Sequence, residues 1–140
     1  MNGPDAPALI PLAVMVATLR EPIEIGRGPV GRRIIYEVDQ ITVKGERIEA
    51  NLAGIAAADW MTIDDDGVLS LDVRFALRTT DGAAIFVQYN GRMANGSSPV
   101  ITAPRFETGD SRYRWLNAVQ AVAKGRFQDR TLTYAIYEVR

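Results

Sequence analysis

The sequence predicts an all-β fold, a single antiparallel up-and-down β-barrel of about eight or more strands with at most one short helical turn. Segments rich in β-branched and aromatic residues run through the chain, and turn signals such as Asp81-Gly82 separate them about every 8 to 12 residues. Closing the sheet removes its exposed edges, and short connections favour pairing in chain order. With 140 residues, we expect residues 1–140 to form one domain.

Individual strands follow from the local pattern. Val68–Arg78 alternates apolar and polar residues throughout, which predicts one buried face. Leu9–Leu19 contains Pro11 and is expected at an edge or a strand start. Pro22–Arg32 holds three glycines and two prolines and is expected to be a loop. Asp110–Trp115 is expected to form the helical turn. The other predicted strands are Arg33–Val43, Arg47–Leu52, Trp60–Ile63, Ala84–Met93, Val100–Phe106, Leu116–Ala123 and Leu132–Val139.

The Asp81-Gly82 pair permits a prediction of strand register. In a two-residue type I′ turn at this site, Leu77 pairs with Phe86 and Leu71 pairs with Arg92. The otherwise apolar face then becomes polar far from the turn, as expected for a barrel that holds a ligand. A shift of one residue would exchange the two faces. The polar residues that this register places there are Gln88, Asn90 and Arg92.

The composition excludes several classes of function. The chain has no cysteine and no histidine, so thiol nucleophiles, histidine-dependent triads and Cys/His zinc sites are impossible. A metal would need oxygen ligands, and Asp64–Gly67 lacks the spacing of a calcium loop. We therefore predict no metal and no cofactor, and acid–base chemistry falls to Asp, Glu or Tyr. A net charge of -1 argues against a nucleic-acid partner.

The apolar run Ala8–Leu19 is too short to span a bilayer and has no basic segment before it. We expect a cytoplasmic protein without a membrane partner. If the strand Leu9–Leu19 leaves an apolar edge exposed, a second subunit could cover it, which predicts a homodimer.

Thr102–Asn117 has the most unusual composition, with three arginines, two carboxylates and three aromatic residues. Arg105 and Glu107 lie one residue apart and share a face if this segment is a strand, with Phe106 opposite. They can form a surface ion pair worth roughly 0–1 kcal/mol. Alternatively, Arg105 grips an anionic substrate and Glu107 carries a proton.

Asp59 and Trp60 follow a run of small residues, Gly54 to Ala58, in which only Ile55 is large. Asp59 either caps a turn or is a buried carboxylate with a raised pKa, which would suit catalysis. Trp60 is expected in the core or at the rim of a pocket.

Several blocks of the sequence together resemble the bacterial and fungal domain of unknown function 3237 family, over nearly the whole chain. The resemblance implies a small β-barrel, in agreement with the strand pattern, and it implies no settled activity. The blocks are Gly31–Ile35, Ala58–Trp60, Asp66-Gly67, Leu71–Phe75, Leu77–Thr79 with Asp81-Gly82, Gly91-Arg92, Thr102–Gly109, Tyr113–Asn117 and Tyr137–Val139.

Two functions remain open. The first is a cofactor-independent lyase, decarboxylase or isomerase acting on a small hydrophobic or aromatic carboxylic acid or carbonyl compound. Glu107 or Asp59 would carry the proton, and Tyr36 or Tyr89 would hydrogen-bond a developing oxyanion. The second is a non-catalytic carrier of a small hydrophobic anion; a purely structural role explains the Arg105 segment least well. The predicted substrate-binding residues are Arg105, Arg92, Asn90, Tyr89, Trp60 and Trp115.

Overall fold

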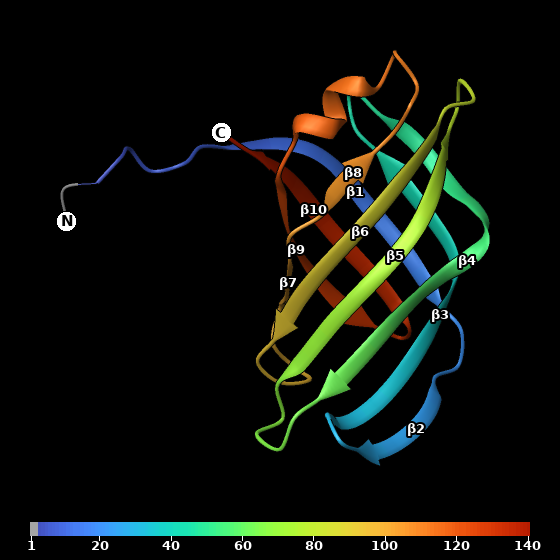
Figure 1. Ribbon diagram of the computed structural model, residues 1–140, viewed down its shortest axis with the longest axis vertical. Coiled ribbons are helices and arrows are strands. Elements are labelled where there is room, and N and C mark those ends of the chain that lie inside the picture. Colours follow the sequence, from blue (N-terminus) through green and yellow to red (C-terminus); the bar gives the residue numbers. More distant parts are fainter. Residues whose placement is uncertain (1–2) are drawn as a thin grey trace.

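The computed structural model describes residues 3–140 and forms a closed antiparallel barrel of eight strands with two additional short strands (Figure 1). This confirms the predicted fold class. The elements are β1 (Leu9–Leu19), β2 (Ile23–Gly28), β3 (Gly31–Lys44), β4 (Glu49–Ile63), β5 (Leu69–Thr79), β6 (Ala84–Met93), β7 (Val100–Thr102), β8 (Arg105–Glu107), the 3₁₀ helix η1 (Arg114–Ala118), β9 (Ala121–Gln128) and β10 (Thr131–Val139).

Strand order follows chain order around the barrel, from β3 through β4, β5, β6, β7, β9 and β10 to β1. Pairing of β1 with β3 then closes the sheet. Strand β2 extends one end of β3, and β8 pairs with β6 beside β7. Within residues 3–140, no helix has the length and apolar character needed to cross a membrane.

Both sides of β1 are paired, which corrects the expected exposed edge. Residues Leu9–Thr18 pair with β10, and Val14–Leu19 pair with β3. Barrel closure places β1 inside the sheet, so its apolar residues need no second subunit to cover a free edge.

Several segments differ from the predicted elements. The predicted strands Arg47–Leu52 and Trp60–Ile63 are parts of one strand, β4, because the backbone stays extended through the small residues between them, and the predicted helical turn Asp110–Trp115 lies slightly later, at Arg114–Ala118. Pro22–Arg32 is not a loop: it forms β2 and the start of β3, with Gly31 at positive φ in the hairpin. Val100–Phe106 is divided into β7 and β8 around Pro104, which has no N–H to donate to a neighbouring strand. Most of the predicted strand Leu116–Ala123 is helix η1 and a connection, and β9 starts only at Ala121.

The β5–β6 register is shifted by one residue from the prediction. Leu77 pairs with Ile85 and Leu71 pairs with Gly91. The cause is a three-residue loop in place of a two-residue type I′ turn: the Thr79 amide donates to the Ala83 carbonyl, and Gly82 has a φ of +94°. The predicted polar face of β6 therefore points outward, and the alternate residues point into the barrel.

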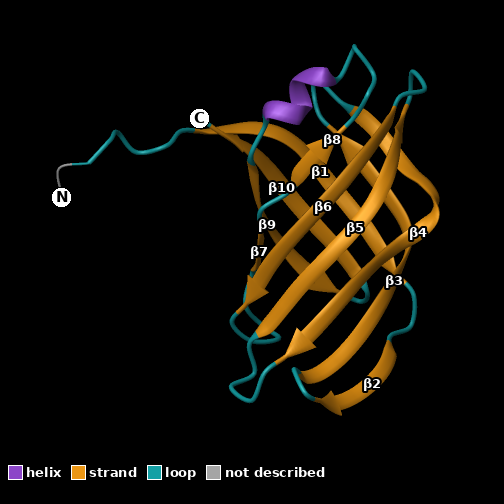
Figure 2. Ribbon diagram, in the orientation of Figure 1, coloured by secondary structure: helices purple, strands orange, loops and turns teal. Residues whose placement is uncertain are grey.

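Inward-facing side chains fill most of the barrel. Phe75, Leu77, Ile85, Leu116 and Tyr134 are all at most 2% exposed. Their packing leaves an apolar internal cavity of about 10 Å³, which has room for about one water molecule. Helix η1 and the loop before it cover one end of the barrel, and the β2–β3 hairpin extends from the opposite end (Figure 2).

Candidate functional site

One layer of the barrel interior contains a carboxyl group between aromatic side chains. Four residues on adjacent strands lie opposite one another in register: Tyr36 on β3, Asp59 on β4, Val73 on β5 and Tyr89 on β6. Residues paired in this way point to the same face of a sheet. Asp59 is only 5% exposed, so it lies on the inner face. Of the two roles expected from the sequence, a turn cap or a buried carboxylate, Asp59 has the second.

An irregularity in β4 places Asp59 there. The register with β5 shifts between Ala53 and Ala58, so the small residues from Gly54 onward bulge outward. Beyond the bulge, the Asp72 backbone amide donates a hydrogen bond of 3.1 Å to Asp59 Oδ1. The carboxyl is thus fixed by the neighbouring strand backbone.

Burial raises the pKa of Asp59 to about 7. The hydrogen bond from the Asp72 amide lowers this pKa and the nearby Asp72 carboxylate raises it, but burial has the largest effect. No cation within residues 3–140 pairs with Asp59. The group can therefore accept or release a proton near neutral pH.

Aromatic side chains cross the barrel in this layer. Tyr89 lies edge-to-face with Tyr134 of β10, with ring centroids 6.0 Å apart, and Tyr36 lies edge-to-face with Phe127 of β9 at the same distance. Neither pair of strands is adjacent in the sheet, so both contacts span the lumen. The in-register row of residues from Tyr36 to Tyr89 joins these two contacts, and Asp59 belongs to that row.

Gly125 makes room for Tyr134. The two residues are partners across β9 and β10, and a Cβ atom at Gly125 would collide with the Tyr134 ring and with the Thr133 carbonyl. The absence of a side chain at Gly125 lets the Tyr134 ring pack against the strand.

Both tyrosine hydroxyls remain protonated near neutral pH. Burial raises the pKa of Tyr89 and of Tyr134, and the negative charge of Asp59 contributes to both shifts. Within residues 3–140, the Thr102 hydroxyl is buried without a hydrogen-bond partner, whereas the hydroxyls of Tyr89 and Tyr134 interact with each other. Thr102, Tyr89 and Tyr134 also line the internal cavity, whereas Asp59 does not. A small polar group in the cavity would find the Thr102 hydroxyl free to form a hydrogen bond.

The layer reaches the end of the barrel opposite η1 through Tyr36 and Phe127. Tyr36 is half-buried and Phe127 is 37% exposed. The interior itself has no cation, because the buried polar and charged residues within 3–140 are Asp59, Thr79 and Thr102. An anion beside Asp59 would lose its hydration without gaining a counter-ion, so the site suits an uncharged molecule.

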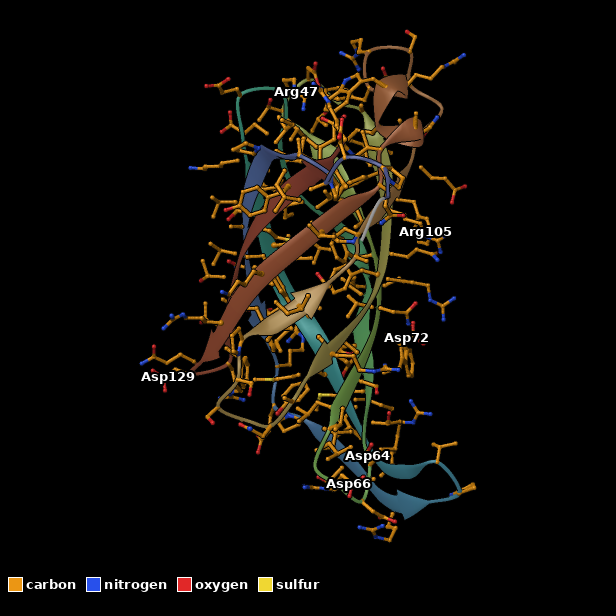
Figure 3. The ribbon with its side chains drawn as sticks, turned by 90° about the vertical axis from the view of Figure 1, so that its left-hand side faces the viewer. Arg47, Asp64, Asp66, Asp72, Arg105 and Asp129 are labelled. Atoms are coloured by element: carbon orange, nitrogen blue, oxygen red, sulfur yellow. The ribbon has the colours of Figure 1, made fainter. Side chains whose placement is uncertain are left out.

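Arg105 and Glu107 lie outside the barrel. They alternate with the buried Phe106 as predicted, and both are exposed. They line an open groove of about 370 Å³ on the outer face, together with Gln88 and Gln120. Figure 3 shows Arg105 pointing away from the barrel. Within residues 3–140, neither Arg105 nor Glu107 forms an ion pair.

The other predicted binding residues are dispersed. Arg92 is exposed and donates to the Ser70 hydroxyl at 3.0 Å, and Asn90 is exposed and donates to the Leu71 carbonyl. Trp60 faces outward on β4 and is 42% exposed. Trp115 lies on η1 beneath the guanidinium of Arg47, which is 4.3 Å from the ring centroid. Of the predicted site residues, the structure brings Asp59, Tyr36 and Tyr89 together inside the barrel, and Arg105 and Glu107 together in the groove outside it.

The charged residues that follow Arg105 tie the end cap to the barrel. We use "end cap" for residues 108–119. Asp81, in the β5–β6 loop, accepts hydrogen bonds from Tyr113 Oη at 2.8 Å and from Thr79 Oγ1 at 2.6 Å. Arg112 pairs with Asp110 at 2.8 Å and with Asp81 at 3.3 Å. This network accounts structurally for much of the polar content of Thr102–Asn117.

Sequence reasoning missed Tyr134, Phe127 and Gly125. A signal existed for Tyr134, because it alternates with Leu132 and Ile136 in a predicted strand. No local pattern could pair it with Tyr89, since that contact depends on barrel closure. Within residues 3–140, no three acidic side chains gather as a metal site.

A family profile matches almost the whole barrel. The family is described as protein of unknown function DUF3237, and its profile matches residues 7–139. The chain belongs to the DUF3237 family. A UPF0311 protein of Rhodopseudomonas palustris is 34% identical over 109 residues, which cover 66% of this DUF3237 chain and 69% of the relative. Another, from Bradyrhizobium diazoefficiens, is 32% identical over 75 residues, and this match spans 42% of the chain and about half (49%) of that relative.

Solved structures share the DUF3237 barrel. A β-barrel-like protein from Acinetobacter baumannii superposes with a TM-score of 0.87 at 25% identity, with 100% of both chains covered. A conserved protein of unknown function from Rhodopseudomonas palustris gives 0.89 at 23% identity, covering 98% of this chain and 100% of the other. A protein described as an enzyme from Penicillium herquei gives 0.80 at 20% identity, covering 100% and 99%.

Proposed function

We propose that this DUF3237 protein is a cofactor-independent isomerase or lyase for small, uncharged, hydrophobic carbonyl compounds, with Asp59 as the proton carrier. The observation that carries the proposal is a buried carboxyl with a pKa of about 7 in a layer whose tyrosine hydroxyls are protonated donors. The description of one structural neighbour as an enzyme is compatible with it.

In this proposal the Asp59 carboxylate removes a proton from the carbon next to the substrate carbonyl. The electron pair moves to the carbonyl oxygen, and the Tyr134 hydroxyl, which is protonated and lies next to that of Tyr89, donates a hydrogen bond to the resulting enolate. Protonated Asp59 then returns the proton to another atom of the substrate, which completes an isomerisation. In a lyase the same proton would go to the leaving group.

The environment of Asp59 narrows the substrate class. Arg105 and Arg92 are outside the barrel, so no guanidinium can neutralise a carboxylate next to Asp59. Among the candidate reactions, this favours the isomerisation or cleavage of neutral ketones over the decarboxylation of an acid. The edge-to-face pairs Tyr36–Phe127 and Tyr89–Tyr134 favour a flat substrate.

Substrate access requires side chains to move, because the internal cavity holds about 10 Å³. The Tyr36–Phe127 pair is the proposed gate, since Phe127 is 37% exposed and reaches across the lumen. Rotation of these two rings would open the Asp59 layer from the end opposite the cap.

The test is exchange of α-protons in D₂O, followed by NMR over a panel of cyclic monoketones and aryl ketones. Wild type should accelerate exchange for at least one compound, with a rate that rises as the pH passes about 7 because the base is the ionised form. Asp59→Asn should lower this rate by roughly 10²–10⁴-fold. The asparagine keeps an acceptor for the Asp72 amide, so the fold is retained.

The matched control is Asp72→Asn, which changes a neighbouring but exposed carboxylate. Removing the Asp72 charge should move the pH at which the rate rises slightly downward, because that charge raises the pKa of Asp59, and should leave the rate well above pH 7 unchanged. The proposal fails if no compound exchanges faster than in buffer, or if Asp59→Asn exchanges protons as fast as wild type. Binding of a compound without exchange would favour the carrier function.

The outer groove supports a second candidate, a binding site for a small anion. Its volume of about 370 Å³ falls in the range of ligand sites, and Arg105 has no ion-pair partner within residues 3–140. A thermal-shift screen of carboxylic acids tests it. A stabilising acid should lose its effect in Arg105→Ala, and no shift across the panel would exclude this carrier function.

A further inference from the structure

The outer face of β3 and β4 carries an apolar groove that no described segment of the chain covers. It has a volume of about 450 Å³, and we call it the Trp60 groove. Trp60 is 42% exposed and Ile23 is 44% exposed, while Ile55 projects from the β4 bulge and is 91% exposed. The floor between them consists of the small residues Ala56 to Ala58. A large exposed apolar patch with a small-residue floor is typical of a protein contact surface.

Two opposite charges flank the floor of the groove. Glu37 pairs in register with Ala58, and Ala58 pairs with Arg74 on the next strand. Two strand spacings separate the backbones of Glu37 and Arg74 by about 10 Å. Neither side chain forms an ion pair within residues 3–140. The acidic Glu37 and the basic Arg74 therefore lie on either side of Ala58, and neither charge is neutralised by an ion pair.

We propose that the Trp60 groove is the interface of a two-fold symmetric dimer of this chain. A two-fold axis that lies in the contact plane, runs parallel to β4 and passes over Ala58 exchanges the two flanks of the groove. It places Glu37 of each copy over Arg74 of the other, which gives two ion pairs from one self-complementary surface. The same axis brings Trp60 of one copy over Trp60 of the second copy.

The strand edges of the fold are poorer candidates for self-association. β1 is paired on both sides. β2 pairs only with β3, but a register shift between Glu24 and Gly26 disrupts its edge, and Arg27 is engaged by Asp65. Bulges and charges of this kind oppose edge-to-edge pairing. The face of the sheet is thus the surface available to a second copy, and this inference does not depend on the proposed reaction.

Reversing the charges of Glu37 and Arg74 tests the interface. Sedimentation velocity over a concentration series should find wild type as a dimer. Glu37→Arg alone or Arg74→Glu alone places like charges opposite each other twice and should weaken the dimer by at least about 100-fold. The double variant Glu37→Arg/Arg74→Glu restores opposite charges and should recover the dimer. Arg105→Glu, an equal charge reversal in the outer groove, is the control and should change nothing.

Circular dichroism of each variant checks folding, which these exposed positions should not affect. A wild-type protein that stays monomeric at about 10⁻⁴ M overturns the proposal and leaves the groove to a different partner. A wild-type dimer that both single reversals leave intact also overturns it, because the dimer then uses another face. Failure of the double variant to recover would contradict the proposed two-fold axis.

Discussion

Carboxylates in two regions of this barrel have opposite properties. In the interior layer, burial without a cation raises the pKa of Asp59 to about 7. In the end cap, hydrogen bonds from the Arg112 side chain and backbone lower the pKa of Asp110 to about 2. The interior carboxyl is poised to exchange a proton, whereas the carboxylate of the end cap stays ionised and holds a loop in place.

Charged residues have different roles in the two regions. The end cap contains Asp110, Arg112 and Arg114, and Arg112 binds both Asp110 and Asp81 of the β5–β6 loop at the surface. The interior layer has one carboxyl, aromatic rings and no cation. The pKa of a carboxyl moves toward neutrality because a single group loses its contact with water, and a high density of charged residues at the surface does not have this effect.

The largest expected effect is on the pH dependence of stability. The raised pKa means that the folded protein binds the Asp59 proton more tightly than the unfolded chain does. The stability that this tighter proton binding gives to the folded state is complete below about pH 4. It disappears as the pH rises through about 7. Asp59→Asn should therefore be more stable than wild type by up to about 4 kcal/mol above pH 7, and by little at pH 4.

Urea unfolding at a series of pH values measures this difference. Asp72→Asn should keep the shape of the wild-type pH profile with its midpoint slightly lower, because the Asp72 charge raises the pKa of Asp59. A constant difference between wild type and Asp59→Asn at every pH would mean that Asp59 titrates normally in the folded state.

A smaller effect is expected from glycine substitutions in the two regions. Gly125→Ala in β9 should lower the free energy of unfolding by about 1–3 kcal/mol, because its Cβ would collide with the Tyr134 ring. Gly109→Ala in the end cap has open space around the new methyl group and should be nearly neutral. If chemical denaturation gives the same loss of unfolding free energy for Gly125→Ala and Gly109→Ala, Tyr134 does not need the space at Gly125.

The end cap should show the reverse pH dependence, with a smaller amplitude. The lowered pKa of Asp110 gives stability that is present above about pH 4 and is lost as the pH falls through about 2. Asp110→Asn should lower the melting temperature slightly at pH 7 and have no effect at pH 2. Added salt should reduce the pH 7 effect because the pair is exposed. An Asp110→Asn protein that loses α-proton exchange would link the end cap to the reaction.

The smallest effect is expected in the outer groove. Glu107→Gln should change the free energy of unfolding by less than about 0.5 kcal/mol, since this exposed side chain forms no ion pair within residues 3–140. It should also leave α-proton exchange intact. If Glu107→Gln abolishes exchange and Asp59→Asn does not, the reaction takes place in the outer groove.

Much of the fold could be predicted because strand signals are local. The bounds of β1 and β6 agree with the prediction, and Phe106 is buried between exposed Arg105 and Glu107 as expected. The placement of Arg92 and Asn90 on the inner face was wrong. The Thr79 hydroxyl binds both the Asp81 carboxylate and the Ala83 amide, which stabilises a three-residue loop and shifts the register by one.

The sequence by itself determined most of the strands, the antiparallel barrel and the absence of histidine and cysteine chemistry, since alternation and composition are properties of the chain alone. Only the tertiary structure decided which carboxylate is buried and which aromatic rings face it. Asp59 and Tyr134 are 75 positions apart in the sequence, and they share a layer because β1 pairs with β3 and closes the sheet. Register and closure are long-range properties, and they convert an ordinary aspartate into one with a pKa near neutrality.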